Sequence, residues 1–324
     1  MHGWIILDKP LGLGSTQAVS AVKRALRTGG YPKLKVGHGG TLDPLASGVL
    51  PVAVGEATKL AGRLLDSDKV YEFTIRFGEE TDTLDAEGKV VATSDVRPTV
   101  AEVEAVLPRF TGPIEQVPPA FSALKVDGER AYDLARSGED VALASRSVII
   151  HALGRSEGRA STSSARTGEI CEAGLPDSVR AEPVEASSFF LEQVTLTAHV
   201  SKGTYIRSLA RDIARALGTV GHVTYLRRVK AGPFVLAQAI SLDKLDALAK
   251  ERALEQILLP LRAGLDDIPA LSLTPDQAGL LRQGQQLIGI AAPDGQCFAM
   301  LGDTPVALAE AKAGTLRVVR GFNL

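Results

Sequence analysis

The chain has 324 residues, 45% of them hydrophobic, and its 36 basic and 38 acidic side chains give a net charge of −2. This length can bury a sizeable core, as one large domain or two, and the near-neutral charge neither indicates nor excludes a nucleic-acid ligand, because phosphate affinity depends on local basic surface. No apolar run approaches the roughly 20 residues of a membrane span, and the start MHGWIILDKP lacks a basic region, so we expect a cytoplasmic protein.

The first elements are a strand and a helix. Residues 4–7 (WIIL) form a strand-like run, and the glycines that follow Pro10 predict a turn. Ser15 is a good N-cap for a helix whose apolar residues recur at helical spacing, and Gly29 with Gly30 predicts its end.

A glycine-rich loop at residues 37–48 separates this helix from the next elements. After the loop we expect another helical stretch. Residues 71–77 (YEFTIRF) then alternate with period two, which is typical of a half-buried strand.

Three further helices are predicted in the middle of the chain. Residues 99–102 (TVAE) are a capping box that opens a short helix ending before Pro108. A second helix is expected near residues 131–136, with Gly138 as its C-cap. The clearest amphipathic pattern is at residues 204–217, where Ile206, Leu209, Ile213 and Leu217 share one face and Gly218 ends the helix.

Two segments differ from the rest in composition. Residues 155–188 are rich in Ser, Arg, Ala and Glu and poor in large apolar side chains, so we predict a mobile insertion between two strands. Residues 261–324 contain short strand-like runs with frequent glycine, which predict a small β-rich C-terminal domain joined to the body by a helical stretch at residues 242–261.

Basic residues are concentrated at residues 202–230, where seven lysines and arginines face a single acid, Asp212. Any nucleic-acid partner is expected to meet the protein there. Arg207, Arg211 and Arg215 fall on one helix stripe, where like charges repel. Either a polyanion relieves that repulsion, or the stripe is a solvated face on which Asp212 pairs with Arg215.

The most informative stretch is residues 37–48 (GHGGTLDPLASG). Its glycines allow sharp turns and close approach of a ligand, and Pro44 restricts Asp43 to extended conformations. The stretch therefore predicts a carboxylate presented on a rigid loop. From local chemistry alone an ordinary turn, in which Asp43 bonds its own backbone, is the favoured interpretation. The G-x-x-x-x-G-K-[ST] pattern of a phosphate loop is absent here.

The stretch resembles the signature of the TruB family of pseudouridine synthases, close to GHxGxLDPxAxG. Further matches follow in the family's order, namely Leu7-Asp8-Lys9-Pro10, Lys69-Val70-Tyr71, Thr81-Asp82-Thr83, Gln116, Pro118-Pro119, Ser201 to Arg207, His222 and Tyr225 to Arg228. The resemblance spans roughly residues 4–245 without the insertion. It implies an α+β fold, with a mixed β-sheet catalytic domain, flanking helices and a small β-rich PUA-like C-terminal domain.

The resemblance also implies the reaction. Uridine 55 in the T-arm of tRNA is isomerised to pseudouridine by breaking its N1–C1′ bond and rejoining the uracil through C5, with no cofactor and no metal. Asp43 matches the catalytic aspartate. A carboxylate there can attack C1′, stabilise a cationic sugar, or remove a sugar proton, and the sequence leaves these roles open.

Other site residues are assigned by the same resemblance. Tyr71 matches the tyrosine placed against the target base, and Arg207 matches the arginine that pairs with the catalytic aspartate. Tyr205 and Leu226 match positions that line the base pocket. His38 is assigned to RNA binding, where it helps hold the T-loop open after the target nucleotide is extracted, because a stacked sugar is inaccessible.

Several of these residues also have a structural interpretation. Read alone, Tyr71 and Leu226 are core residues and Lys9 belongs to a strand-to-helix turn rather than a phosphate site. Asp82 and Asp85 favour a structural role over Mg²⁺ binding, because no other ligand set is apparent. Cys171 and Cys297 lie outside any metal-ligand spacing and are expected to be free thiols.

The predicted organisation is a catalytic domain at residues 1–250 and a PUA-like RNA-binding domain at residues 261–324. The expected partner is the T-arm of tRNA, without guide RNA or membrane, and we expect a monomer. Two alternatives stay open. One is a protein that grips and refolds tRNA without catalysis, which the Asp43, Tyr71 and Arg207 trio disfavours. The other is a relative that modifies another RNA, as the H/ACA-guided enzymes do.

Overall fold

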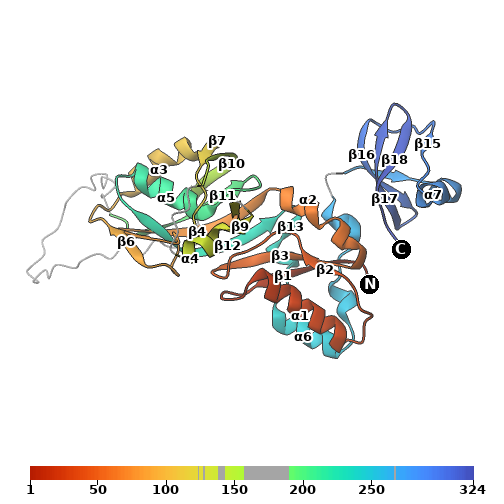
Figure 1. Ribbon diagram of the computed structural model, residues 1–324, viewed down its shortest axis with the longest axis horizontal. Helices are drawn as coiled ribbons and strands as arrows, with labels where there is room; N and C mark the ends of the chain where they lie inside the picture. Colours follow the sequence, from red (N-terminus) through yellow and green to blue (C-terminus); the bar gives the residue numbers. More distant parts are fainter. Residues whose placement is uncertain (123, 127, 138–142, 157–189, 266–267) are drawn as a thin grey trace, which may run out of the picture. The chain divides into compact units, whose positions relative to one another are not determined.

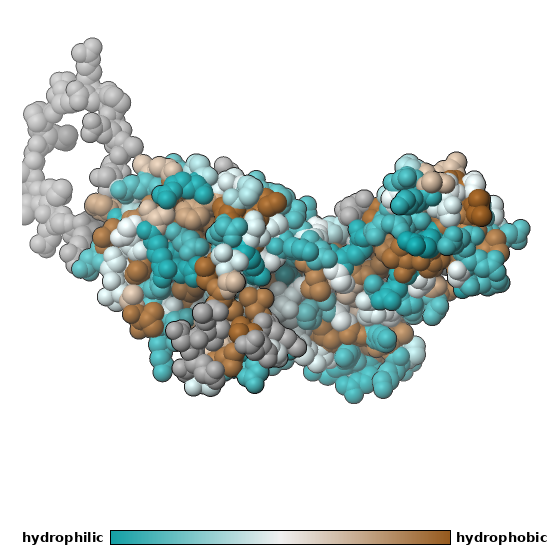
Figure 2. Space-filling model, turned by 45° about the horizontal axis from the view of Figure 1, so that its top comes forward, coloured by the Kyte–Doolittle hydropathy of each residue, from teal (hydrophilic) through white to brown (hydrophobic). Residues whose placement is uncertain are grey.

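The computed structural model describes residues 1–122, 124–126, 128–137, 143–156, 190–265 and 268–324 (Figure 1). The chain forms two compact units, one of Met1–Lys69 with Arg227–Leu324 and one of Val70–Leu226. No helix in the described ranges is both long and apolar enough to cross a membrane. On the face drawn in Figure 2, hydrophilic and hydrophobic residues are intermixed.

The first unit is built on the antiparallel pair β1 (Gly3–Lys9) and β3 (Ala46–Val54). The strand order continues from β3 to β12 (Gly221–Ala231), while β2 (Val36–His38) pairs with β3 and β13 (Phe234–Val235) with β12. The boundary between the units falls within β12. Because β2 and β3 are antiparallel neighbours, the seven residues between them, which include Asp43, must reverse the chain.

Helices α1 (Ser15–Thr28) and α6 (Leu242–Lys250) pack against each other beside this sheet (Figure 1). The predicted α1 is confirmed, but its N-cap is Gly14 and not Ser15, because the Ser15 hydroxyl bonds the backbone of Leu42. Gly29 is the C-cap, as expected.

The helical stretch expected between the loop at 37–48 and the strand at residue 71 is present, but a strand that the sequence did not predict comes before it. Residues 46–54 form strand β3, and helical structure begins with a 3-10 turn at Gly55–Lys59 and continues in α2 (Ala61–Asp66). Nearly every residue of β3 is buried, so its sequence is a continuous apolar run without alternation. Such a run does not distinguish a buried strand from a buried helix.

The C-terminal part of the first unit is β-rich, as expected. Its five-stranded sheet has the order β14-β16-β17-β18-β15, and α7 (Pro275–Arg282) packs on it. The strands are β14 (Ala270–Ser272), β15 (Leu287–Ile288), β16 (Gly295–Leu301), β17 (Thr304–Lys312) and β18 (Thr315–Gly321). Cys297 is a free, buried thiol in this sheet, whereas Cys171 lies outside the described residues.

The second unit contains a sheet of order β12-β4-β11-β10-β7. Its strands are β4 (Lys69–Phe77), β7 (Gly112–Gln116), β10 (Arg146–Arg155) and β11 (Gln193–Val200), with the small pairs β5 (Glu79–Thr81) with β6 (Val90–Thr93) and β8 (Lys125–Val126) with β9 (Glu129–Arg130). Its helices are α3 (Val100–Val106), α4 (Ala131–Arg136) and α5 (Ile206–Ala216).

All three predicted helices of this unit are present. Thr99 caps α3 through the expected capping box, and α5 begins two residues later than predicted, because Tyr205 is still extended at its N-cap. The C-cap of α4 is Ser137, and the expected cap Gly138 lies outside the described residues. The predicted insertion at 155–188 also lies outside them from residue 157 onward, and it is flanked by the antiparallel neighbours β10 and β11.

Candidate active site

Asp43 lies half-buried on the loop between β2 and β3. The Ala46 amide donates to the Asp43 carbonyl at 3.0 Å, and the Gly12 amide donates to the Pro44 carbonyl at 2.8 Å. The loop is therefore attached to the turn that follows β1. These backbone contacts fix the position of the residue that carries the candidate catalytic carboxylate.

Ser15 holds the residue before Asp43 from the other side. Its buried hydroxyl accepts a hydrogen bond from the Leu42 amide at 2.8 Å and donates one to the Leu42 carbonyl at 2.9 Å. One side chain thus satisfies both backbone polar groups of the buried residue Leu42, which would otherwise destabilise the loop.

Lys9 is fully buried beneath the loop. Its ammonium group donates to the carbonyls of Leu13 at 2.6 Å, Pro10 at 3.0 Å and Pro44 at 3.4 Å. Burial lowers the pKa of Lys9 to about 8, an effect that the Asp43 carboxylate opposes and the Arg228 charge reinforces. The turn interpretation of Lys9 agrees with this geometry, because its donors are engaged by carbonyls.

Arg228 is the second buried cation of the loop, with 1% of its surface exposed. Its guanidinium donates to the carbonyls of Val49 at 2.8 Å, Thr41 at 3.2 Å and Gly40 at 3.2 Å. The backbone of β12 also passes close to Gly48, where an added Cβ would lie 2.2 Å from the Arg228 carbonyl oxygen. Sequence reasoning noted Arg228 only as a motif match and missed this anchoring role.

His38 ends β2 and is half-buried. Burial lowers its pKa, and the Arg228 charge adds to the effect, so the imidazole is neutral at pH 7. Within the described residues its buried Nδ1 has no hydrogen-bond partner. A neutral ring with an unsatisfied nitrogen suits a hydrogen bond to a ligand better than proton transfer.

The low pKa of Lys9 predicts an alkaline limb in the activity. Above pH 8 the amine is neutral, so one of its three hydrogen bonds to carbonyls and the positive charge near Asp43 are lost. We expect the single-turnover rate of a reaction at Asp43 to fall as the pH rises through about 8. A Lys9→Met variant should be slower at every pH and should lack this limb, so an unchanged limb in the variant would rule out Lys9 as its source.

In the second unit, Arg207 forms a buried ion pair with Asp85, with 3.1 Å between Nη1 and Oδ2. Its guanidinium also donates to the carbonyls of Thr83 and Phe121. Because Asp43 belongs to the first unit, its pairing with Arg207 stays a prediction.

Asp82 and Asp85 are both engaged locally. Asp85 accepts from the Thr83 hydroxyl at 2.6 Å and the Glu87 amide at 3.1 Å, and Asp82 accepts from the Lys89 amide at 2.9 Å. These contacts agree with the structural role favoured for both aspartates.

Tyr205 is held at the start of α5 by Gln116, whose buried amide accepts from the Tyr205 N–H at 2.8 Å and donates to its carbonyl at 3.1 Å. The Arg146 guanidinium lies 4.5 Å from the centre of the Tyr205 ring. Two of its buried nitrogens, Nε and Nη2, have no partner among the described residues. Arg146 is a lone arginine outside the basic stretch, so no sequence pattern singled it out.

Tyr71 and Leu226 lie on β4 and β12, which are adjacent in the strand order of the second unit. Leu226 is buried and Tyr71 is half-buried. The structure thus places four predicted site residues, Tyr71, Tyr205, Arg207 and Leu226, in the second unit, and places His38 and Asp43 in the first.

Most cations of the basic stretch at residues 202–230 bind other groups of the protein. Arg211 pairs with Asp212 at 2.8 Å and Arg215 with Glu80 at 2.9 Å, so the expected pairing of Asp212 with Arg215 is wrong. Arg227 pairs with Asp8 at 2.7 Å. Asp212 pairs with the adjacent Arg211 rather than with its i+3 neighbour Arg215, which pairs with an acid of another strand. These cations are therefore less available to a phosphate backbone than the sequence suggested.

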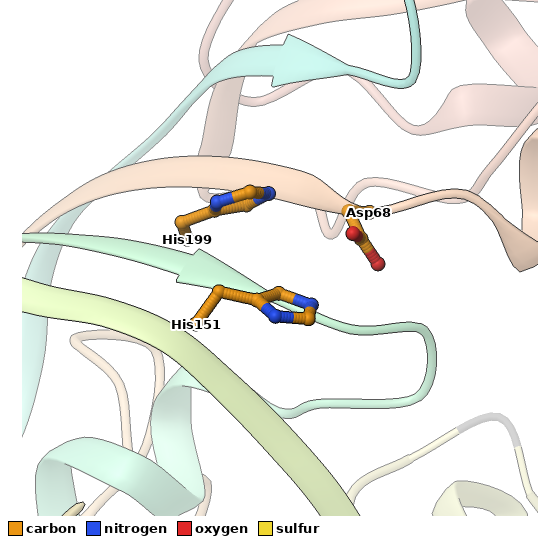
Figure 3. A group of neighbouring side chains, drawn as sticks. All are labelled: Asp68, His151 and His199. Carbon is orange, nitrogen blue, oxygen red and sulfur yellow. The ribbon is translucent and has the colours of Figure 1, made fainter. Parts of the chain in front are cut away.

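Two histidines lie side by side on neighbouring strands of the second unit. The rings of His151 on β10 and His199 on β11 have centroids 4.8 Å apart and are tilted by 45° (Figure 3). The two imidazoles would supply two of the four ligands of a typical zinc site. Sequence reasoning did not pair them, since they are 48 residues apart and belong to no motif.

Comparison with known families and proteins places this geometry in context. The TruB family pseudouridylate synthase N-terminal domain matches residues 23–160, and the tRNA pseudouridylate synthase B C-terminal domain matches residues 207–266. A tRNA pseudouridine synthase B from Novosphingobium aromaticivorans is 62% identical over 100% of this chain and 98% of the relative. One from Zymomonas mobilis is 58% identical over 100% of this chain and 96% of the relative.

Solved structures share the fold. An H/ACA ribonucleoprotein bound to a substrate RNA containing 2′-deoxyuridine matches with a TM-score of 0.67 at 22% identity, over 99% of this chain and 85% of the matched chain. An archaeal box H/ACA Nop10–Cbf5 complex matches with a TM-score of 0.65 at 23% identity, over 99% and 86%. With its signature loop, both family domains and relatives of high identity over its full length, the chain belongs to the TruB family of pseudouridine synthases.

Proposed function

We propose that this chain converts uridine 55 in the T-arm of tRNA to pseudouridine in the cytoplasm, acting as a monomer without cofactor, metal or guide RNA. The observation that carries the proposal is the Asp43 loop, on which Ser15, Lys9 and Arg228 satisfy the backbone on three sides. A loop held this way presents its carboxylate in one position, as a reacting group requires.

The isomerisation needs a carboxylate and a closed pocket. The N1–C1′ bond of uridine breaks, a C5–C1′ bond forms, the C5 proton leaves and N1 gains a proton, so atoms balance without an oxidant or an energy source. Asp43 acts at the sugar, as nucleophile, as counter-charge to a cationic sugar, or as base toward a sugar proton. The Asp43 carboxylate raises the pKa of nearby Lys9, against the larger effect of burial that lowers it to about 8.

The residues of the second unit are proposed to hold the base and the strand. Tyr71 stacks on the uracil and shuttles the C5 proton, while Tyr205 and Leu226 line the base pocket. Arg207, already oriented by Asp85, pairs with Asp43. The nitrogens of His38 and Arg146 that have no partner within the described residues are donors or acceptors left for RNA once the target nucleotide has been extracted.

The C-terminal sheet is proposed to be the PUA-like domain at residues 261–324, which contacts tRNA outside the T-loop, with residues 1–250 as the catalytic domain. The close relatives named tRNA pseudouridine synthase B support tRNA over another RNA as the substrate. The solved H/ACA relatives lie below 25% identity and support only the fold.

The experiment that tests the proposal uses an unmodified tRNA transcript labelled with tritium at uridine C5. Since pseudouridine formation replaces that hydrogen, the wild-type chain should release tritium to water, and mapping the product should place the change at the T-arm uridine. A matched transcript with cytidine at that position should release no tritium. Tight tRNA binding without release would contradict the enzyme proposal and favour the tRNA-folding alternative.

A further inference from the structure

A cavity of about 740 Å³ lies between α1 and β2 in the first unit. Its walls come from α1, from the segment that joins α1 to β2, from the first residues of β2, and from Thr58 and Ala61. Lys23 and Arg27 of α1 and Lys33 and Lys35 of the joining segment belong to its lining. We call these four residues and the cavity they border the basic groove.

The basic groove has one sign of charge. None of its lining residues is acidic, and all four cations are exposed. Across the described ranges, no side-chain hydrogen bond or ion pair involves any of them, whereas arginines of the 202–230 stretch bind carboxylates. Lys23 and Arg27 are also separated by one helical turn, so they repel each other until an anion lies between them.

The floor of the basic groove is apolar. Leu26 is buried, and Leu34 and Val36 are half-buried. Cations around an apolar floor fit a ligand that carries both phosphates and flat rings, since the phosphates meet the cations while a base rests on the hydrocarbon surface. A nucleotide chain has both parts. A simple inorganic anion would leave the floor unused.

The basic groove is joined to the catalytic loop by a single strand. Val36 and Gly37 line it, and the next residue of β2 is His38, after which the chain enters the loop that carries Asp43. A strand rises about 3.3 Å per residue, so only a short length of β2 separates the groove from the loop. A polynucleotide whose target nucleotide reaches Asp43 therefore passes near the groove. The sequence directed attention to residues 202–230, but the four groove cations precede the signature loop in the chain, at residues 23–35.

We propose that the basic groove binds the sugar-phosphate backbone and one base of the substrate RNA beside the target nucleotide. The inference rests on the proposed function for its choice of RNA. Binding there adds affinity and fixes the register of the strand, and leaves the chemical step to Asp43. Removing groove cations therefore raises KM for tRNA and leaves kcat at saturating tRNA unchanged.

The test compares two double variants that remove the same charge. Lys33→Ala with Lys35→Ala removes two of the four cations that line the basic groove. Lys244→Ala with Lys250→Ala removes two exposed lysines of α6, which lie outside the groove in the same unit. Binding of unmodified tRNA is measured by fluorescence anisotropy between 50 and 300 mM salt, and tritium release gives kcat and KM.

We expect the groove variant to bind tRNA about 10-fold more weakly, with the slope of log affinity against log salt reduced by about 1.4–1.8, because each lost phosphate contact contributes about 0.7–0.9 to that slope. The α6 variant should match the wild type. Equal affinity and equal slope for the two variants would overturn the groove proposal. If the groove variant lowers the salt slope of tRNA binding but the wild type releases no tritium, the proposed reaction is contradicted while the groove proposal is supported.

Discussion

Replacing Asp43 by asparagine is expected to lower the rate of tritium release from tRNA by about 10⁴-fold or more, the scale of loss when the acting nucleophile or base is removed. Asparagine has the same size and can keep the Ala46 and Gly12 contacts, which involve backbone atoms of the loop. The change therefore removes charge and basicity and leaves the loop in place. Single-turnover rates with excess enzyme measure the loss without interference from product release.

Two controls make the Asp43 result specific. The free energy of urea unfolding and the affinity for tRNA should stay near their wild-type values, since the backbone of the loop is held by Ser15, Lys9 and Arg228. Asp276→Asn changes an exposed aspartate of α7 and should leave the rate unchanged. A rate for Asp43→Asn above a tenth of wild type would exclude Asp43 as the reacting group.

Replacing Arg228 by methionine is expected to lower the free energy of unfolding by about 3–5 kcal/mol, the range for leaving buried polar groups without their charged partner. The carbonyls of Gly40, Thr41 and Val49 lose their charged donor. The rate of tritium release should fall together with the stability, because the loop no longer fixes Asp43. Urea unfolding and single-turnover kinetics on the same preparation measure both effects.

A second substitution separates charge from geometry at this position. Arg228→Lys keeps the positive charge but replaces a planar group that reaches three carbonyls with one compact ammonium. It should recover only part of the stability and little of the rate. Arg320→Met, in which an exposed arginine of β18 is changed, should alter stability by less than about 0.5 kcal/mol. Full activity in Arg228→Lys would show that charge alone matters here.

Much of the fold was predictable from local signals. The Thr99 capping box, the period-two run of β4 and the apolar face of α5 each follow from neighbours within a few residues. Strand β3 was missed because its signal is not local. Nearly all of its residues are buried, and the resulting apolar run carries no period.

The candidate site was predictable only in part, for a related reason. The motif around Asp43 indicated which residue reacts, but not what holds it. Arg228 reaches Thr41 across 187 residues, and Lys9 reaches Pro44 across 35. No spacing rule connects such pairs. Charge counting also failed at residues 202–230, where pairing with acids such as Glu80, 135 residues away from Arg215, determines which cations remain for RNA.

The long separation between Arg228 and the loop has a consequence during synthesis. The loop leaves the ribosome early, yet the side chain that binds Gly40 and Thr41 is added 187–188 residues later. At a translation rate of about 5–20 residues per second, that interval is about 10–40 s. During that interval only Ser15 and Lys9 are available to hold the loop that carries Asp43. The nascent chain therefore becomes competent for chemistry only after β12 has emerged and paired.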